Sequence, residues 1–85
     1  MNALLIHESR GRMRLLCRLK QKEMSLRQAD LLEAWFQQQS WISRVTVHER
    51  TGCVILYYTG ARETVLRAVR RFSWEQAEQS VSLPA

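Results

Sequence analysis

A strict alternation of apolar and mostly basic residues near the N-terminus constrains the fold of this chain more than any other feature of its sequence. Residues 12–20 read RMRLLCRLK. The apolar residues on every second position are Met13, Leu15, Cys17 and Leu19, and the positions between them carry Arg12, Arg14, Leu16, Arg18 and Lys20. Because successive side chains of a strand point to opposite faces, the pattern predicts a half-buried β-strand. We expect Ala3–His7 to begin the same strand, with a break near residues 9–11.

The remaining sequence switches between helical and strand patterns. Ser25 and Gln28 have the spacing of a capping box, and apolar residues then recur every three or four positions. These residues are Leu26, Ala29, Leu31, Leu32, Trp35 and Phe36. Strands are predicted over residues 42–49 and 53–58, a second amphipathic helix over residues 61–72, and a last short strand over residues 79–83.

The residues Glu49-Arg50-Thr51-Gly52 join the two middle strands. Gly52 can adopt the positive φ that a short hairpin with a bulge requires. Placing Glu49 opposite Cys53 fixes the register of the hairpin. In that register Cys53, Ile55 and Tyr57 point into the core, and Val54, Leu56 and Tyr58 lie on the other face.

The predicted elements have the order βαββαβ. This order predicts an α+β fold of the ferredoxin-like type, with a four-stranded antiparallel sheet of strand order 4-1-3-2 and two helices on one face. The 85 residues are expected to form a single domain, 1–85, with its core over about residues 6–83.

The positive net charge indicates an anionic partner but does not identify its class. The net charge of +5 fits binding to phosphate, an acidic protein or an anionic membrane surface. The two cysteines have neither disulfide nor metal spacing, which indicates a reducing, cytoplasmic setting. The apolar run over residues 3–6 is too short for a signal peptide or a membrane span, so no membrane insertion by this segment is expected.

Three stretches of the sequence carry a resemblance to a known family: SRGRMRLLCRL, WISRVTVHERTGCVILYY and ARETVLRAVRRF. Across roughly residues 6–72 the chain resembles a heavy-metal-associated domain, in a divergent branch that lacks the metal-binding cysteine pair. That branch opens with Pro-Gly-Arg-x-Arg, enters its second strand with Gly-Val and turns with Thr-Gly. Here Arg10 replaces the proline, Trp41-Ile42 replaces Gly-Val, and Thr51-Gly52 keeps the turn. The resemblance implies the cytoplasmic N-terminal domain of a cation-transporting P-type ATPase.

The metal site of that family is not reproduced in this sequence. The family motif Gly-Met-x-Cys-x-x-Cys supplies two thiolates to Cu(I) or Zn(II). When Gly11 is aligned with its glycine, Arg14 replaces the first cysteine and Cys17 occupies the second position. A guanidinium cannot ligate a cation, and the alternation points Cys17 inward. We therefore expect no cofactor and no metal, with Cys17 as a weak candidate ligand only.

Catalytic patterns are also lacking, because the sequence has no Gly-rich phosphate loop, no suitably spaced carboxylate pair and no Ser-His-Asp set. We expect a non-catalytic interaction or regulatory domain, and not an enzyme. Its predicted docking surface is an open sheet face with a basic border, made of Arg12, Arg14, Arg18, Lys20, Val54, Leu56 and Tyr58. A second basic surface is the helix face with Arg67, Arg70 and Arg71. His7 and His48 are expected to be ordinary surface residues.

The expected partner is another domain of a parent ATPase, another protein or a second copy of the chain. The alternative is a small basic nucleic-acid-binding module, because RNA-recognition-motif domains share the predicted topology.

Overall fold

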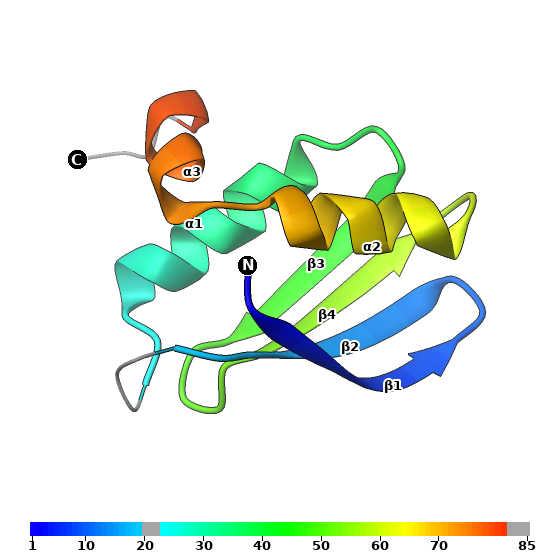
Figure 1. The fold of residues 1–85 in the computed structure, drawn as a ribbon, viewed down its shortest axis with the longest axis horizontal. Helices are drawn as coiled ribbons and strands as arrows, with labels where there is room; N and C mark the ends of the chain where they lie inside the picture. The colour runs from blue at the N-terminus through cyan, green and yellow to red at the C-terminus, as the bar shows by residue number, and fades with distance from the viewer. Residues whose placement is uncertain (20–22, 82–85) are drawn as a thin grey trace.

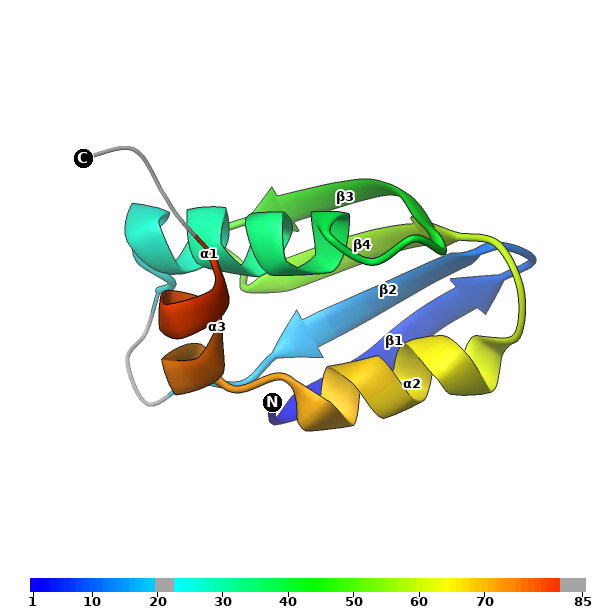
Figure 2. The same ribbon diagram turned by 90° about the horizontal axis from the view of Figure 1, so that it is seen from above.

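The computed structural model describes residues 1–19 and 23–81, which form a four-stranded antiparallel sheet covered by helices. The strands are β1 (Ala3–Ser9), β2 (Arg12–Cys17), β3 (Ile42–His48) and β4 (Cys53–Tyr58). The helices are α1 (Leu26–Gln37), α2 (Arg62–Arg71) and α3 (Trp74–Ser80), and they lie on one side of the sheet (Figures 1 and 2). The α+β class and the four-stranded antiparallel sheet are confirmed.

The strand order is β1-β2-β4-β3, so the predicted order 4-1-3-2 is wrong and a ferredoxin-like topology is not confirmed. Two of the three predicted neighbour pairs are right, because the strands at residues 12–17, 53–58 and 42–48 lie side by side as expected. The error is at one edge, which β1 occupies in place of residues 79–83. The break expected near residues 9–11 is a reversal of the chain, since Ser9 lies opposite Arg12 and Gly11 has a φ of +74°.

Residues 74–80 form α3, so Gln79 and Ser80, which were predicted to begin the last strand, belong to a helix instead. Ser73 is its N-cap, and its side chain accepts a hydrogen bond of 3.1 Å from the backbone N–H of Gln76. Such a cap satisfies one of the N–H groups that the first turn of a helix leaves unpaired. Ala77 is fully buried, so the helix contributes to the core. Residues 82 and 83 of the predicted strand lie outside the described residues.

The capping box predicted for α1 is confirmed. The Ser25 side chain accepts from the Gln28 N–H at 3.0 Å, and the Gln28 side chain accepts from the Ser25 N–H at 2.9 Å. The helix that follows buries five residues against the sheet and the other helices, namely Ala29, Leu31, Leu32, Trp35 and Phe36. An edge-to-face contact of 5.1 Å between the rings of Trp35 and Phe72 links α1 to the end of α2.

Within the β3–β4 hairpin, β3 faces as predicted, but β4 has the opposite facing from the one predicted. His48, rather than Glu49, lies opposite Cys53, and Val45 lies opposite Leu56. The loop therefore has four residues, 49–52, and the N–H of Gly52 donates to the carbonyl of His48 at 2.9 Å. A slip of one residue moves every side chain to the other face. Val54, Leu56 and Tyr58 consequently lie in the core, whereas Cys53, Ile55 and Tyr57 lie on the side away from the helices.

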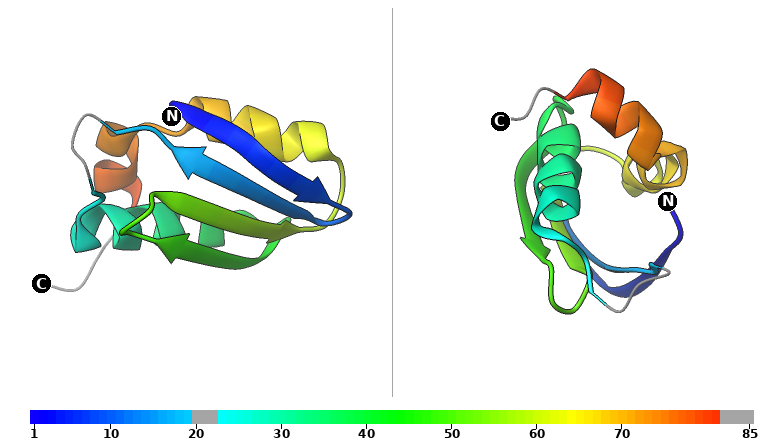
Figure 3. Two further views of the ribbon diagram at one scale, coloured as in Figure 1. Left: turned by 90° about the horizontal axis from the view of Figure 1, so that it is seen from below. Right: turned by 90° about the vertical axis from the view of Figure 1, so that its left-hand side faces the viewer.

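The sheet curves around the helices, and none of the three described helices lies over its other face (Figure 3). The covered face carries Met13 and Leu15 of β2, which are essentially inaccessible to solvent. Cys17 follows them on the same face and is buried, as predicted from the alternation. We call the uncovered side of the sheet the outer face.

Candidate functional site

Strand pairing arranges the outer face in three rows that cross the whole sheet. From β1 to β3 the rows are Ser9, Arg12, Tyr57 and Arg44; then His7, Arg14, Ile55 and Thr46; then Leu4, Leu16, Cys53 and His48. Directly opposite residues of antiparallel strands project to the same face, so each row is a line of neighbouring side chains. The outer face is defined by these three rows.

The first row places a phenol between two guanidinium groups. The Arg12 guanidinium carbon lies 5.8 Å from the centre of the Tyr57 ring, and that of Arg44 lies 5.7 Å from it. Arg12 Nε also donates to the Tyr57 hydroxyl at 3.4 Å. This hydrogen bond, together with the positive charges of Arg12 and Arg44, lowers the pKa of the Tyr57 phenol. The row is thus suited to hold an anion beside an aromatic ring.

The second and third rows contain apolar groups that are buried although the helices lie on the other side of the sheet. Cys53 is 5% exposed and Ile55 is 9% exposed, although both lie on the outer face. Arg14, which is itself exposed, reaches over the thiol, and its Nη2 lies 3.7 Å from the sulfur of Cys53. Long cationic side chains commonly cover apolar surface with their methylene stems while the charge stays in water. Arg14 therefore forms part of the outer surface and also shields the groups beneath it.

The three rows contain no carboxylate. Glu8 is the acidic residue of the described strands, and it lies opposite Met13, whose side chain faces the core. Its carboxylate accepts two hydrogen bonds from Arg62 of α2, at 2.5 and 3.0 Å, and these bonds lower its pKa. The acidic residues of α1 and α3 belong to the helical side of the molecule, where Arg27 pairs with Glu78. The outer face is therefore uniformly basic.

Of the residues predicted to form the docking surface, the arginines face outward as expected and the apolar centre does not. Arg12 and Arg14 lie on the outer face, and Arg18 is exposed just after β2 ends. Val54, Leu56 and Tyr58 are buried under the helices because of the shifted hairpin register. Lys20 lies outside the described residues.

Two basic surfaces are present, and they lie on different sides of the molecule. Arg67, Arg70 and Arg71 are exposed on α2, which belongs to the helical layer. Because α2 covers the inner face of the sheet, these arginines are separate from the outer face (Figure 2).

Neither cysteine has the surroundings of a metal site within residues 1–19 and 23–81. That part of the chain holds no group of three or more His, Cys, Asp and Glu side chains that could bind a metal ion. Burial raises the pKa of the Cys17 thiol, which disfavours the thiolate that a soft metal needs. Cys53 is buried as predicted, but it lies on the outer face and not in the core beside Cys17.

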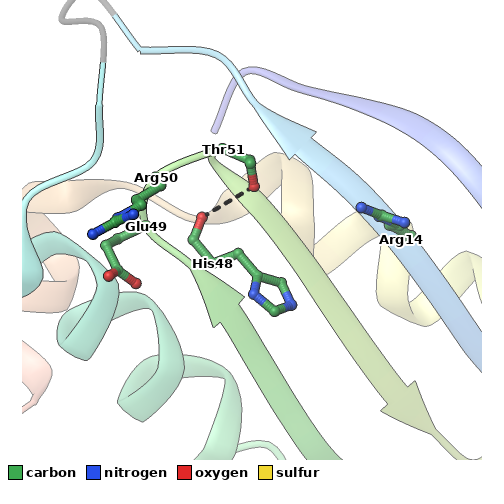
Figure 4. Close-up of a pocket in the computed structure, with 5 residues that line it drawn as sticks. All are labelled: Arg14, His48, Glu49, Arg50 and Thr51. Atoms are coloured by element: carbon green, nitrogen blue, oxygen red, sulfur yellow. Dashed lines mark hydrogen bonds between the residues drawn. The ribbon is translucent and has the colours of Figure 1, made fainter.

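Sequence reasoning missed the members of the outer face that come from β3 and β4. The sequence predicts Tyr57 in the core and His48 as an ordinary surface residue, and it does not single out Arg44 as a site residue. His48 is exposed, as expected, and borders a shallow hollow of about 360 Å³ together with Arg14, Glu49, Arg50 and Thr51 (Figure 4). The pairing of Arg44 with Tyr57 required the correct hairpin register, for which the sequence has no decisive signal.

Among the described residues no helix combines the length and the apolar character needed to cross a membrane. No protein-family model, curated protein or solved structure matches this chain.

Proposed function

We propose that this chain is a non-catalytic interaction domain that docks an acidic protein surface through its outer face. The observation that carries this proposal is the basic character of that face: three arginines and two histidines stand in three rows without a carboxylate. Arginine and tyrosine are enriched at protein interfaces, and charge complementarity raises the association rate and excludes wrong partners.

The resemblance described above adds a context for the partner. In a cation-transporting P-type ATPase, the acidic surface would belong to another cytoplasmic domain of the same protein, and the chain would have a regulatory role. A titration of the reduced chain with Cu(I) and Zn(II) tests the premise that the family's metal site is lost. We expect no stoichiometric uptake. Tight binding that disappears in Cys17→Ser contradicts this part of the proposal.

The docking surface is tested with a fluorescent glutamate-rich peptide and two matched triple variants. One variant changes Arg12, Arg14 and Arg44 to Gln, and the other changes Arg67, Arg70 and Arg71 to Gln. Both remove three positive charges from exposed or half-buried positions, so their net charges are identical. We expect the first variant to lose at least tenfold in affinity and the second to lose little. Equal losses would mean that net charge alone attracts the peptide, and the outer face would then have no special role.

Single-stranded nucleic acid is a second candidate, favoured by the position of Tyr57 between two guanidinium groups. Bases stack on aromatic side chains, while arginines neutralise the phosphates around them. This function predicts binding of an oligouridylate that weakens steeply between about 50 and 200 mM salt. It also predicts that Tyr57→Leu weakens binding of the oligonucleotide and leaves binding of the acidic peptide nearly unchanged. If no oligonucleotide binds at either salt concentration, this candidate is excluded.

A further inference from the structure

The hollow at the β3–β4 end of the outer face is lined by two residues of the strands, Arg14 and His48, and by residues of the turn. Figure 4 shows Arg14 and the imidazole of His48 on the same side of the sheet, whereas Glu49 and Arg50 extend away from Arg14 at the turn. Arg14 and His48 therefore face each other across the part of the hollow that lies over the sheet.

Sheet geometry fixes the spacing of these two residues. Arg14 is on β2 and His48 on β3, with β4 between them. Neighbouring strands lie about 4.8 Å apart, and the two residues are also two positions apart along β4, so their backbones are separated by roughly 12 Å. Cys53, opposite His48 and in contact with Arg14, lies between them as an almost buried floor. Two side chains standing at this separation can hold one small anion between them.

Thr51, at the rim of the hollow, has its hydroxyl engaged in hydrogen bonds within the hairpin. The Thr51 hydroxyl donates to the carbonyl of His48 at 3.4 Å and accepts from the N–H of Cys53 at 3.3 Å. Its proton is thus already used within the hairpin. By contrast, the guanidinium of Arg14 has five N–H donors, and its one bond here is a long contact to sulfur.

Donors on two sides of a hollow require an anion that accepts hydrogen bonds in more than one direction. A carboxylate has two oxygens in one plane, and a single guanidinium fork satisfies both of them. A phosphate monoester has three acceptor oxygens and a charge of about −1.5 to −2 at pH 7, so it can face the fork of Arg14 and the ring of His48 together. The arrangement thus selects phosphate over carboxylate by geometry as well as by charge.

We propose that Arg14 and His48 form a phosphate subsite of the outer face and that its occupant is a phosphorylated serine or threonine on the partner protein. This inference rests on the proposed function, because the subsite is one part of the docking surface. The remaining part, formed by Arg12, Tyr57 and Arg44, contacts acidic residues that flank the phosphorylated one.

The test compares three fluorescent peptides of one acidic sequence that carry phosphoserine, glutamate or serine at a central position. We expect the phosphoserine peptide to bind at least tenfold more tightly than the glutamate peptide. Arg14→Lys keeps the charge and removes the fork, and His48→Gln removes the ring, so each variant should abolish most of that preference. Arg67→Lys is the matched control on α2 and should keep it. Circular dichroism of each variant verifies that the fold is intact.

The outcomes separate the subsite from the docking surface. If the phosphoserine and glutamate peptides bind equally well, and the change of Arg12 and Arg44 to Gln still abolishes binding, the subsite is wrong and the docking surface stands. If none of the peptides binds, both proposals fail. Inorganic phosphate and a 5′-phosphorylated oligonucleotide are added as competitors. Displacement of the phosphoserine peptide by either one at equal concentration overturns the assignment to a phosphorylated protein.

Discussion

The register of β4 determines which surface this protein presents, and a pair of truncations tests it. Leu56 is fully buried between the sheet and the helices, whereas Ile55 lies on the outer face with 9% of its surface exposed. Leu56→Ala removes side-chain atoms from a site enclosed on all sides. Such truncations cost about 2–5 kcal/mol, and the cost depends on how well the surroundings can close the cavity.

We expect Leu56→Ala to lower the free energy of unfolding by about 3 kcal/mol or more, because packed strands and helices cannot move into the space. Ile55→Ala should cost about 2 kcal/mol, at the low end of the range, because the flexible arginine stems above it can collapse onto the gap. The unfolding entropy of a chain of this size is about 0.18 kcal/mol/K near its Tm. The Leu56 variant should therefore melt roughly 17 °C or more below the parent chain, and the Ile55 variant roughly 11 °C below it.

Urea unfolding followed by tryptophan fluorescence measures both variants, and thermal melts give the second readout. The slope of free energy against urea must remain unchanged for the comparison to concern the folded state. Equal losses for the two variants, or a larger loss for Ile55→Ala, would refute the facing of β4 and with it the composition of the outer face.

Two further predictions concern the glycine at the hairpin and the buried thiol. Gly52 has a φ of +76°, and a Cβ on it would lie 3.0 Å from the carbonyl oxygen of Cys17. Gly52→Ala should therefore destabilise the protein by more than the cost of the backbone conformation alone, about 1–2 kcal/mol, whereas Gly60→Ala, with a φ of +89° and no atom within 4 Å, should cost only that amount. Similar Tm losses for these two variants would contradict the close approach of the hairpin to β2. For Cys17, burial raises the pKa of the thiol above the ordinary value of 9.0, so the folded state holds the proton more tightly than the unfolded state. Its contribution to stability is then constant below about pH 9 and declines as the pH rises further. Thermal melts between about pH 8 and pH 10 should show a steeper loss for the parent chain than for Cys17→Ala, and parallel losses would show that the thiol ionises as easily in the folded state.

Local signals in the sequence predicted those parts of the fold that are decided locally. The alternation at residues 12–17, the capping box at Ser25 and the turn at Gly52 each correspond to an observed element. The helix at residues 74–80 had a signal of the same kind, because Ser73 and Gln76 repeat the Ser-x-x-Gln spacing of α1. The reversal at Gly11 was likewise visible as a glycine between two β-forming stretches. The missed helix and the missed reversal have one cause, because the prediction assigned the edge strand beside β2 to residues 79–83 and not to residues 3–9.

The facing of β4 could not be predicted in this way. Its sequence, CVILYY, is apolar on both faces, and both faces are largely buried in the fold. Alternation therefore has no information about which side faces the helices. The register then depends on whether the hairpin loop has three or four residues, and Glu49-Arg50-Thr51-Gly52 is compatible with both lengths. The resulting slip of one residue removed Tyr57 from the predicted outer face and placed Val54, Leu56 and Tyr58 there.

The same two-sided burial links the stability of the sheet to its proposed binding. Cys53 and Ile55 are shielded on the outer face by side chains such as Arg14, and none of the described helices lies over them. A ligand that draws the Arg14 guanidinium toward itself moves the stem that covers the thiol, and so exposes apolar area to water. A free ion offers nothing to replace that cover, whereas a peptide carries apolar atoms next to its charged group and can restore it. The affinity of the outer face should therefore exceed what its charges alone supply when the anion is attached to a chain that lies along the strands. An added methyl group beside the phosphate, as in phosphothreonine compared with phosphoserine, should increase the affinity for the parent chain and have no effect in a Cys53→Ala, Ile55→Ala double variant.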